Sequence, residues 1–322
     1  MGAPIFIIGR QHSGNTMLAR CLGRAPEVHS LTGEGQFFEH QAFLDDKSTD
    51  EKIASVVSLV EQSGGDIPSE ARSELHNHMR RSRADGGSSG TAAEMYARCM
   101  EWLAQEKGAG RWAQKATSYV FHVEAILECF PDARLVFLVR NPLDLAASMK
   151  RRGGWTAVAR MTYGWNKGVR SALRYAETNP DRLLIVRYEQ FVEESYRKMA
   201  EVCDLCDLPF RESYLEVPHV NQSESPYNQS STTEGISNSR VGYYQDVLSD
   251  TEIGAVRTLV DDRLLKALYA DHLHSMEASL ADVSYAVGLA ISGGARIVKD
   301  HAATLLKDPR HTIQRVRKRL LA

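Results

Sequence analysis

The sequence has few cysteines, and they are not arranged as a disulfide framework or a metal site. Five occur in 322 residues, an odd number without regular spacing. Cys203 and Cys206 have the C-x-x-C spacing, but they occur in an amphipathic helical stretch without a second pair, which favours buried free thiols. An H-E-x-x-H sequence and a Cys/His cluster are also missing. We therefore expect a reduced, cytoplasmic protein that holds no metal.

An excess of positive charge and a long apolar run are missing too. The formal net charge is -2, which argues against nucleic acid as a partner because such proteins have a basic face. The apolar stretch from Val283 to Ile291 is too short to cross a bilayer. The first apolar strand begins at residue 4, which leaves no room ahead of it for a signal peptide, and Phe6 does not fit the myristoylation pattern. We expect a soluble protein without a transmembrane segment.

The N-terminal stretch predicts a strand, a tight loop and a helix. Residues 4–8 are apolar and rich in β-branched side chains, as in a parallel strand that is buried on both faces. Residues 16–23 then carry apolar side chains at helical spacing. Residues 9–16, called the anion loop below, therefore lead into a helix N-terminus, where free N–H groups and the helix dipole favour a phosphate or sulfate.

The anion loop matches the P-loop pattern G-x-x-x-x-G-K-[ST] at Gly9, Gly14 and Thr16, but Asn15 replaces the lysine. That lysine contacts the β- and γ-phosphates in P-loop NTPases, so this loop is poorly equipped for ATP hydrolysis. It can still hold one 5′-phosphate group through backbone donors and Thr16. An ordinary turn between a strand and a helix remains the alternative.

A second stretch points to the same edge of the sheet. Residues 134–139 form another apolar strand that runs directly into Arg140. Pro142 suits a first helical turn, which places Ser148 about two turns into the next helix. Ligands of open α/β sheets bind outside the carboxyl ends of the strands. We therefore expect Arg140 and the anion loop to serve one ligand.

These two stretches resemble the sulfotransferases that use 3′-phosphoadenosine-5′-phosphosulfate (PAPS). The family's P-[RK]-S-G-T-T loop for the 5′-phosphosulfate is similar to residues 11–16, and its R-x7-S motif for the 3′-phosphate is similar to Arg140 and Ser148. Three more segments follow in the family's order: residues 112–119, similar to W-x-E-K-[TS]; residues 187–191, similar to R-Y-E-D-L; and residues 239–249, similar to S-x-V-G-R-W-[RK]-D-x-L-[ST]. The resemblance covers residues 4 to about 265. It implies PAPS as the donor, adenosine 3′,5′-bisphosphate (PAP) as the product and no metal.

The resemblance also implies which residues bind the nucleotide, although the chain departs from the family at three of the motif positions. His12 stands where the family has Arg or Lys, Asn15 where it has Thr, and Tyr243 where it has Arg. We expect Arg10 or Lys115 to supply part of the missing positive charge. Tyr188 matches the position near the adenine, with a core tyrosine as the alternative. The nucleotide-binding residues expected from the resemblance are Arg10, Gln11, His12, Ser13, Gly14, Asn15, Thr16, Arg140, Ser148, Tyr188, Arg240, Val241 and Gly242.

Sulfuryl transfer needs a group that removes a proton from the acceptor. Family members that act on small molecules use a histidine in a K-x-H motif, but this chain has Thr117 there. Tyrosylprotein and heparan-type members use a glutamate soon after the first helix, and Glu34 is similar to it. Lys115 would neutralise charge on the bridging oxygen, with a structural salt bridge as the alternative. The base is predicted to be Glu34, with alternatives at Glu39, His40 and His12.

Alternating strands and helices predict an α/β fold of three layers, with a central parallel sheet flanked by helices. Helices expected near residues 48–63, 69–82 and 91–107 form a helical insertion over about residues 40–110, and residues 219–240 form a polar loop expected to act as a lid. A further strand is expected over residues 183–187, and further helices over residues 118–129, 189–205 and 249–266. We expect a first domain over residues 1–275 and a C-terminal helical extension over residues 276–322, through which the chain could form a homo-oligomer.

The sequence leaves the acceptor and two other functions open. The acceptor is a hydroxyl- or amine-bearing carbohydrate, lipid headgroup, peptide or small metabolite. A small-molecule kinase with the same loop is disfavoured by Asn15 and by Arg140, since a kinase of this type needs a carboxylate after an apolar strand. A nucleotide-binding domain without turnover is the third reading, because His12, Asn15 and Tyr243 depart from the family.

Overall fold

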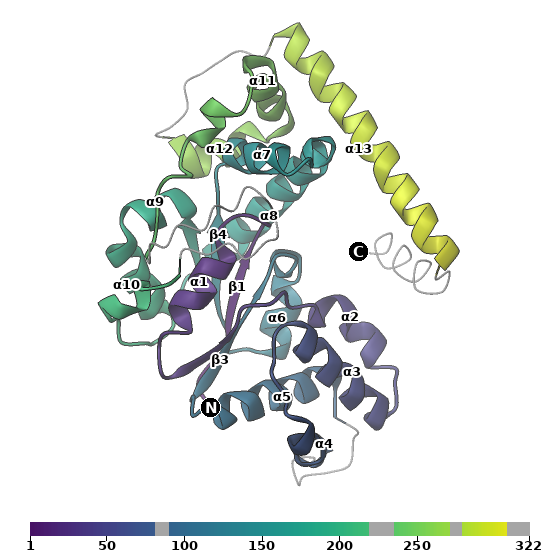
Figure 1. Cartoon of the computed structure of the whole chain (residues 1–322), viewed down its shortest axis with the longest axis vertical. Helices are drawn as coiled ribbons and strands as arrows, with labels where there is room; N and C mark the ends of the chain where they lie inside the picture. The colour runs from purple at the N-terminus through teal and green to yellow at the C-terminus, as the bar shows by residue number, and fades with distance from the viewer. Residues whose placement is uncertain (81–89, 219–234, 271–278, 308–322) are drawn as a thin grey trace. The chain divides into compact units, whose positions relative to one another are not determined.

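The computed structural model describes residues 1–80, 90–218, 235–270 and 279–307, with side chains to residue 295. The chain divides into two compact units: Met1–Asn141 with Lys167–Val241, and Pro142–Asn166 with Gly242–Ala322 (Figure 1). Helix α8 (Val158–Thr178) contributes to both. The predicted division at residue 275 stays a prediction.

The first unit contains a parallel sheet of five strands: β1 (Ile5–Gly9), β2 (Val28–Leu31), β3 (Arg111–Ala116), β4 (Arg134–Val139) and β5 (Leu183–Arg187). Their order across the sheet is β2-β3-β1-β4-β5. Every residue of β1 is buried, which explains why its sequence does not alternate between apolar and polar residues. Because β1 lies between β3 and β4, the segments that follow these three strands emerge side by side at one edge.

Helices cover both faces of the sheet. On the face of Ile5 and Ile7, apolar side chains pack from α1 (Asn15–Leu22), α9 (Tyr188–Glu193) and α10 (Ser195–Leu205). On the opposite face the Phe6 ring lies 5.3 Å from that of Trp112 and 6.0 Å from that of Phe38 in α2 (Phe37–Leu44), between ring centroids. Figure 1 shows α2, α3 (Thr49–Gln62), α5 (Ala92–Glu106) and α6 (Val123–Cys129) across the strands from α1, α9 and α10. The predicted three-layer α/β fold is confirmed.

The helices expected before β3 are confirmed as α3 (Thr49–Gln62), α4 (Arg72–Arg80, after the 3-10 turn η1, Ser69–Ala71) and α5 (Ala92–Glu106). Two of them begin with a capping box. Ser48 and Glu51 satisfy each other's backbone N–H groups at the start of α3, and Thr91 and Glu94 do so at the start of α5. These reciprocal bonds fix where each helix begins.

Other elements differ from the sequence prediction. Two expected helices are each divided: the 189–205 segment at Glu194, where the backbone leaves helical angles, and the 249–266 segment before Asp261, whose side chain caps a new helix by accepting from Arg263 N. The expected helix at 118–129 is a 3-10 turn, η2 (Tyr119–Phe121), followed by α6 (Val123–Cys129). Strand β2 was not predicted, because its four residues form a half-buried edge strand that mixes polar and apolar side chains.

The second unit is helical within the described residues. It holds α7 (Pro142–Arg151), η3 (Trp155–Ala157), η5 (Tyr243–Asp246), α11 (Asp250–Leu259), α12 (Asp262–Tyr269) and α13 (Leu280–Lys307). Lys150 of α7 pairs with Glu252 of α11 at 2.6 Å, and Ala286 and Leu289 of α13 pack against Ala255. Most of the expected lid, residues 219–234, lies outside the described residues. Among the helices that are described, none has the length and apolar character needed to span a bilayer.

Candidate active site

The anion loop connects β1 to α1, and close packing requires glycine at both of its glycine positions. A Cβ at Gly9 would lie 2.3 Å from Leu138 O of the neighbouring strand. Gly14 has a φ of 96°, and a Cβ there would lie 2.8 Å from the Tyr188 ring. The turn between them is closed by Ser13 N donating to Arg10 O at 3.1 Å. The loop therefore lies close against β4 and Tyr188.

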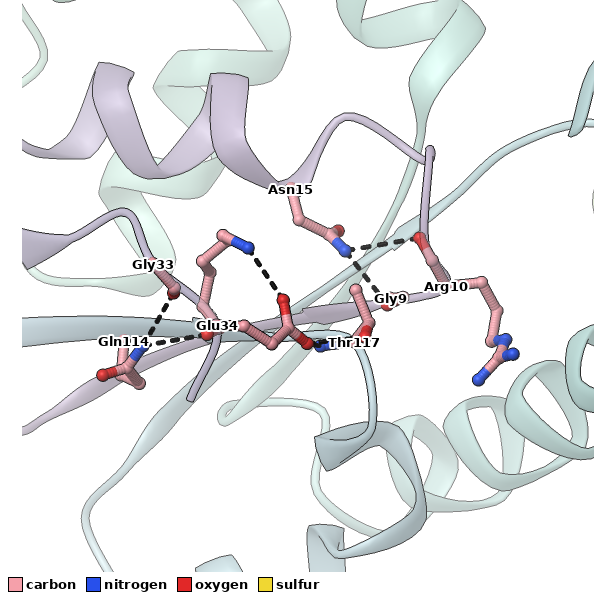
Figure 2. A network of polar contacts seen from close by, with 8 residues as sticks. Gly9, Arg10, Asn15, Gly33, Glu34, Gln114 and Thr117 are labelled. Carbon is pink, nitrogen blue, oxygen red and sulfur yellow. Dashed lines mark hydrogen bonds and ion pairs between the residues drawn. The ribbon is translucent and has the colours of Figure 1, made fainter. Parts of the chain in front are cut away.

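Asn15, which replaces the P-loop lysine, is a structural part of the anion loop. It is 5% exposed, and its Nδ2 donates to Gly9 O at 3.0 Å and to Arg10 O at 3.3 Å (Figure 2). Both acceptors are carbonyl oxygens, so only the amide nitrogen of Asn15 can bond to them. The side chain holds the start of the loop in place, where a P-loop lysine would reach toward phosphates.

Ser13 supplies a buried hydroxyl in the middle of the anion loop. Its Oγ is buried, with the residue 1% exposed, and has no hydrogen-bond partner among the residues that the structure describes. A buried hydroxyl without a partner is costly unless a ligand completes its bonds. The next residues begin α1, whose first-turn N–H groups point toward the same loop. The loop thus fits an anionic group such as a phosphate or sulfate.

Arg140, directly after β4, contacts the anion loop from the other side. It is 6% exposed, donates to His12 O at 3.2 Å and to Arg240 O at 2.6 Å, and its guanidinium carbon lies 4.5 Å from the centre of the Tyr188 ring. His12 has a φ of 70°, which non-glycine residues rarely adopt. The first unit therefore brings together four of the expected nucleotide-binding residues: His12, Arg140, Tyr188 and Arg240.

Glu34 and Lys115 form an ion pair near the same edge of the sheet (Figure 2). Lys115 Nζ lies 2.8 Å from Glu34 Oε2, while Thr117 donates to Oε1 from both its backbone N and its Oγ1, each at 2.5 Å. Ala116 pairs with Ile8 in the sheet, so Thr117 and Gly9, the next residues, lie at the same level at the ends of neighbouring strands. A carboxylate, an ammonium group and a hydroxyl are thus gathered where β3 ends.

The alternatives to Glu34 as the base lie elsewhere in the first unit. Glu39 is exposed in the first turn of α2, and His40 follows it on that helix. His12 lies in the anion loop, where its carbonyl accepts from Arg140. Within the described ion pairs, Glu34 is the carboxylate that meets Lys115.

The other predicted residues are placed as follows. Figure 2 shows the Arg10 guanidinium directed away from Asn15, and its carbon lies 5.5 Å from the Phe121 ring centre. Val241 N donates to Asn238 O at 2.9 Å. Gln11 is exposed and Thr16 is half-buried. Ser148 and Gly242 belong to the second unit, in which Asp144 accepts from Gly242 N at 2.9 Å and from Tyr244 N at 3.1 Å.

Three further side chains support the site and were not predicted. Thr117 orients Glu34, and Gln114 bonds to Gly33 O at 3.2 Å and to Lys115 O at 2.9 Å. Glu189 is 5% exposed and accepts from Asn141 N at 2.8 Å, which fixes the backbone next to Arg140. Each lies within or beside a recognised motif, but the sequence does not reveal the backbone groups to which it bonds.

The cysteines form no site. All five are free, and Cys203 and Cys206 are both buried, which confirms the expectation of buried free thiols. Burial raises the pKa of Cys206 to about 12 and that of Cys203 to about 11. Thiols with such pKa values are not nucleophiles at neutral pH. Among the described residues, no group of three or more His, Cys, Asp or Glu side chains could hold a metal ion.

Comparisons with known proteins identify the family of the chain. A model of the sulfotransferase family matches residues 4–212. No curated protein matches the chain. Similar solved structures include the sulfotransferase domain of the olefin synthase of Synechococcus PCC 7002 (21% identity, 90% of this chain and 95% of that one, TM-score 0.46), the sulfotransferase domain from the curacin biosynthetic pathway (18%, 90% and 98%, 0.45) and the sulfotransferase STF9 of Mycobacterium avium (16%, 86% and 78%, 0.44). The chain belongs to the sulfotransferase family.

Proposed function

We propose that this sulfotransferase transfers a sulfuryl group from PAPS to a hydroxyl or amine of an acceptor and releases PAP. One observation carries the proposal: the anion loop follows β1, Arg140 follows β4, and Glu34, after β2, pairs with Lys115 near the end of β3, so all three lie at the same edge of adjacent strands. When bound, PAPS supplies the sulfuryl group, and the bond from sulfur to the bridging phosphate oxygen breaks as the bond from sulfur to the acceptor forms.

The residues present fit this nucleotide. The hydroxyl of Ser13 and the N–H groups at the start of α1 are suited to the 5′-phosphosulfate. Arg140 is suited to the 3′-phosphate, because a guanidinium keeps its charge and binds phosphate with paired donors. Ser148 and Gly242 stay assigned to the nucleotide by the resemblance alone. Tyr188 stays assigned to the adenine side, next to Gly14.

Glu34 accepts the proton of the acceptor in this proposal. Thr117 holds its Oε1 with two donors, so the carboxylate keeps one orientation while Oε2 faces Lys115. Lys115 offsets the negative charge that develops on the bridging oxygen as the transfer proceeds. In this proposal both residues act by position and charge.

A transfer assay with ³⁵S-labelled PAPS tests the proposal. The purified chain is incubated with separate pools of carbohydrates, lipid headgroups, tyrosine peptides and small alcohols, and label in the acceptor fraction is counted. We expect one pool to be labelled, and Glu34→Gln to reduce the labelling to a small residual rate while PAP still binds in calorimetry. The exposed variant Glu39→Gln serves as the matched control and should keep the wild-type rate.

Three results would contradict the proposal. PAP at about a hundred times its dissociation constant should raise the free energy of unfolding by about 2.7 kcal/mol. If PAP does not stabilise the chain, the donor is another molecule. If ATP with Mg²⁺ stabilises it instead, the chain is a kinase. Full turnover by Glu34→Gln would place the base at another residue.

A further inference from the structure

Gln114 is a fully buried polar residue that the reaction itself does not require. It lies in β3 between Ala113 and Lys115 and is 0% exposed. Neighbouring Trp112, on the same face of the sheet, packs against the Phe6 ring. The Oε1 atom of Gln114 is buried and has no hydrogen-bond partner among the described residues. An apolar side chain would avoid that unsatisfied oxygen, so the amide nitrogen must provide a compensating role.

The amide nitrogen of Gln114 joins the two segments that carry the ion pair. Nε2 donates to Gly33 O at 3.2 Å, and Gly33 directly precedes Glu34. It also donates to Lys115 O at 2.9 Å, an oxygen that accepts from Gly35 N at 2.9 Å as well. Figure 2 shows the Gln114 amide directed at Gly33 next to Glu34. The backbone on both sides of Glu34 is therefore bound to β3.

The backbone on both sides of Glu34 is closely packed, and a side chain would not fit at either glycine. A Cβ at Gly33 would lie 2.3 Å from Ser63 O, the carbonyl that follows α3. A Cβ at Gly35 would lie 2.9 Å from Gln114 Cγ and 3.0 Å from the hydroxyl of Tyr119. Glu34 thus extends from a backbone held between the end of α3 and the Gln114 side chain.

We propose that Gln114 is a positioning residue for the sulfuryl-transfer step, acting by holding the Gly33–Gly35 backbone so that the Glu34 carboxylate meets Lys115 and Thr117. The inference rests on the proposed function, in which Glu34 is the base. It assigns the amide group a specific task, because only a side chain with two donors on one nitrogen can bond to both carbonyls. A shift of about 1 Å in a reacting group can lower a rate about 100-fold.

The test compares Gln114→Met with the control Gln105→Met, an exposed glutamine of α5. Methionine keeps the length of the side chain and fills the apolar surroundings, but it donates no hydrogen bond. For Gln114→Met we expect kcat to fall about 10- to 100-fold, with KM for the acceptor and the affinity for PAP changed less than about twofold. Gln105→Met should match the wild type. Gln114→Asn keeps the amide on a shorter side chain, and its kcat should lie between that of Gln114→Met and that of the wild type.

A double-mutant cycle separates positioning from a general loss of structure. If Gln114 acts through Glu34, adding Gln114→Met to Glu34→Gln lowers the residual rate less than about twofold. An equal loss in both backgrounds, or an unchanged kcat in Gln114→Met, would overturn the inference. The proposed function fails on different results. It fails if the wild-type chain transfers no sulfate, or if Glu34→Gln keeps full turnover. Full turnover by Glu34→Gln also overturns the inference about Gln114.

Discussion

Asn15 offers the sharpest test of how the anion loop is built. The substitution Asn15→Ala removes the bonds to Gly9 O at 3.0 Å and to Arg10 O at 3.3 Å. Each is worth about 1 kcal/mol, and the longer one less, so we expect the free energy of unfolding to fall by about 1–2 kcal/mol. PAP should also bind more weakly, because the loop carbonyls are no longer held in place.

Asn15→Asp sharpens this prediction. A carboxylate has the shape of the amide but donates nothing, and at this 5% exposed position it would face two carbonyl oxygens. We expect it to cost more stability than Asn15→Ala. The assay is urea denaturation at pH 8, followed by calorimetry with PAP. The control is Asn77→Ala on the exposed face of α4, whose free energy of unfolding should lie within about 0.5 kcal/mol of that of the wild type. An Asn15→Asp variant as stable as Asn15→Ala would refute this account of the loop.

Two further predictions concern Arg140 and His29. Arg140→Ala should weaken PAP binding by about 2–3 kcal/mol and should weaken binding of AMP, which lacks the 3′-phosphate, by less. An unchanged ratio of PAP to AMP affinity in calorimetry would argue against the assignment of Arg140 to the 3′-phosphate. Arg140→Lys should retain part of the preference for PAP. Burial, and then the charge of Lys107, lower the pKa of His29 below its ordinary value of about 6.5. The unfolded chain therefore binds more protons than the folded chain as the pH falls below that value. The free energy of unfolding should then decrease between pH 7 and pH 5, and the denaturation curves of His29→Gln should show a smaller decrease.

Much of the fold could be predicted because the strands are long apolar runs. The strands at residues 134–139 and 183–187 have the predicted bounds, since buried parallel strands are apolar on both faces. Strand β2 is different: His29 and Ser30 are half-buried, and pairing with β3 decides its conformation. The break at Glu194 likewise depends on tertiary packing, because the sequence around it has helical character.

The sequence named residues of the candidate site but not their contacts. Glu34 and Lys115 were both named, yet only the sheet order places the segment after β2 next to the end of β3. Asn15 was interpreted as a missing lysine, while the structure shows it bonded to two carbonyls. Bonds between a side chain and a distant backbone group leave no periodic pattern in a sequence. Roles such as those of Thr117 and Gln114 therefore require coordinates.

The Glu34–Lys115 pair also determines how a loss of activity must be interpreted. The Lys115 side chain is 11% exposed and that of Glu34 is 36% exposed, so Glu34→Gln leaves a largely buried ammonium group without its carboxylate. Breaking a buried pair costs about 3–5 kcal/mol, and the exposure of Glu34 reduces that cost here. An inactive Glu34→Gln variant could then be inactive because Lys115 has moved.

The variant Glu34→Gln/Lys115→Met separates these causes. It removes both charges and should recover stability relative to Glu34→Gln in urea denaturation, since no unpaired charge remains. With Glu34 as the base and Lys115 offsetting charge on the bridging oxygen, the double variant lacks both groups and should be no faster than Glu34→Gln even though its fold is restored. A double variant that regained turnover would show that the unpaired lysine, and not the missing carboxylate, had stopped the reaction.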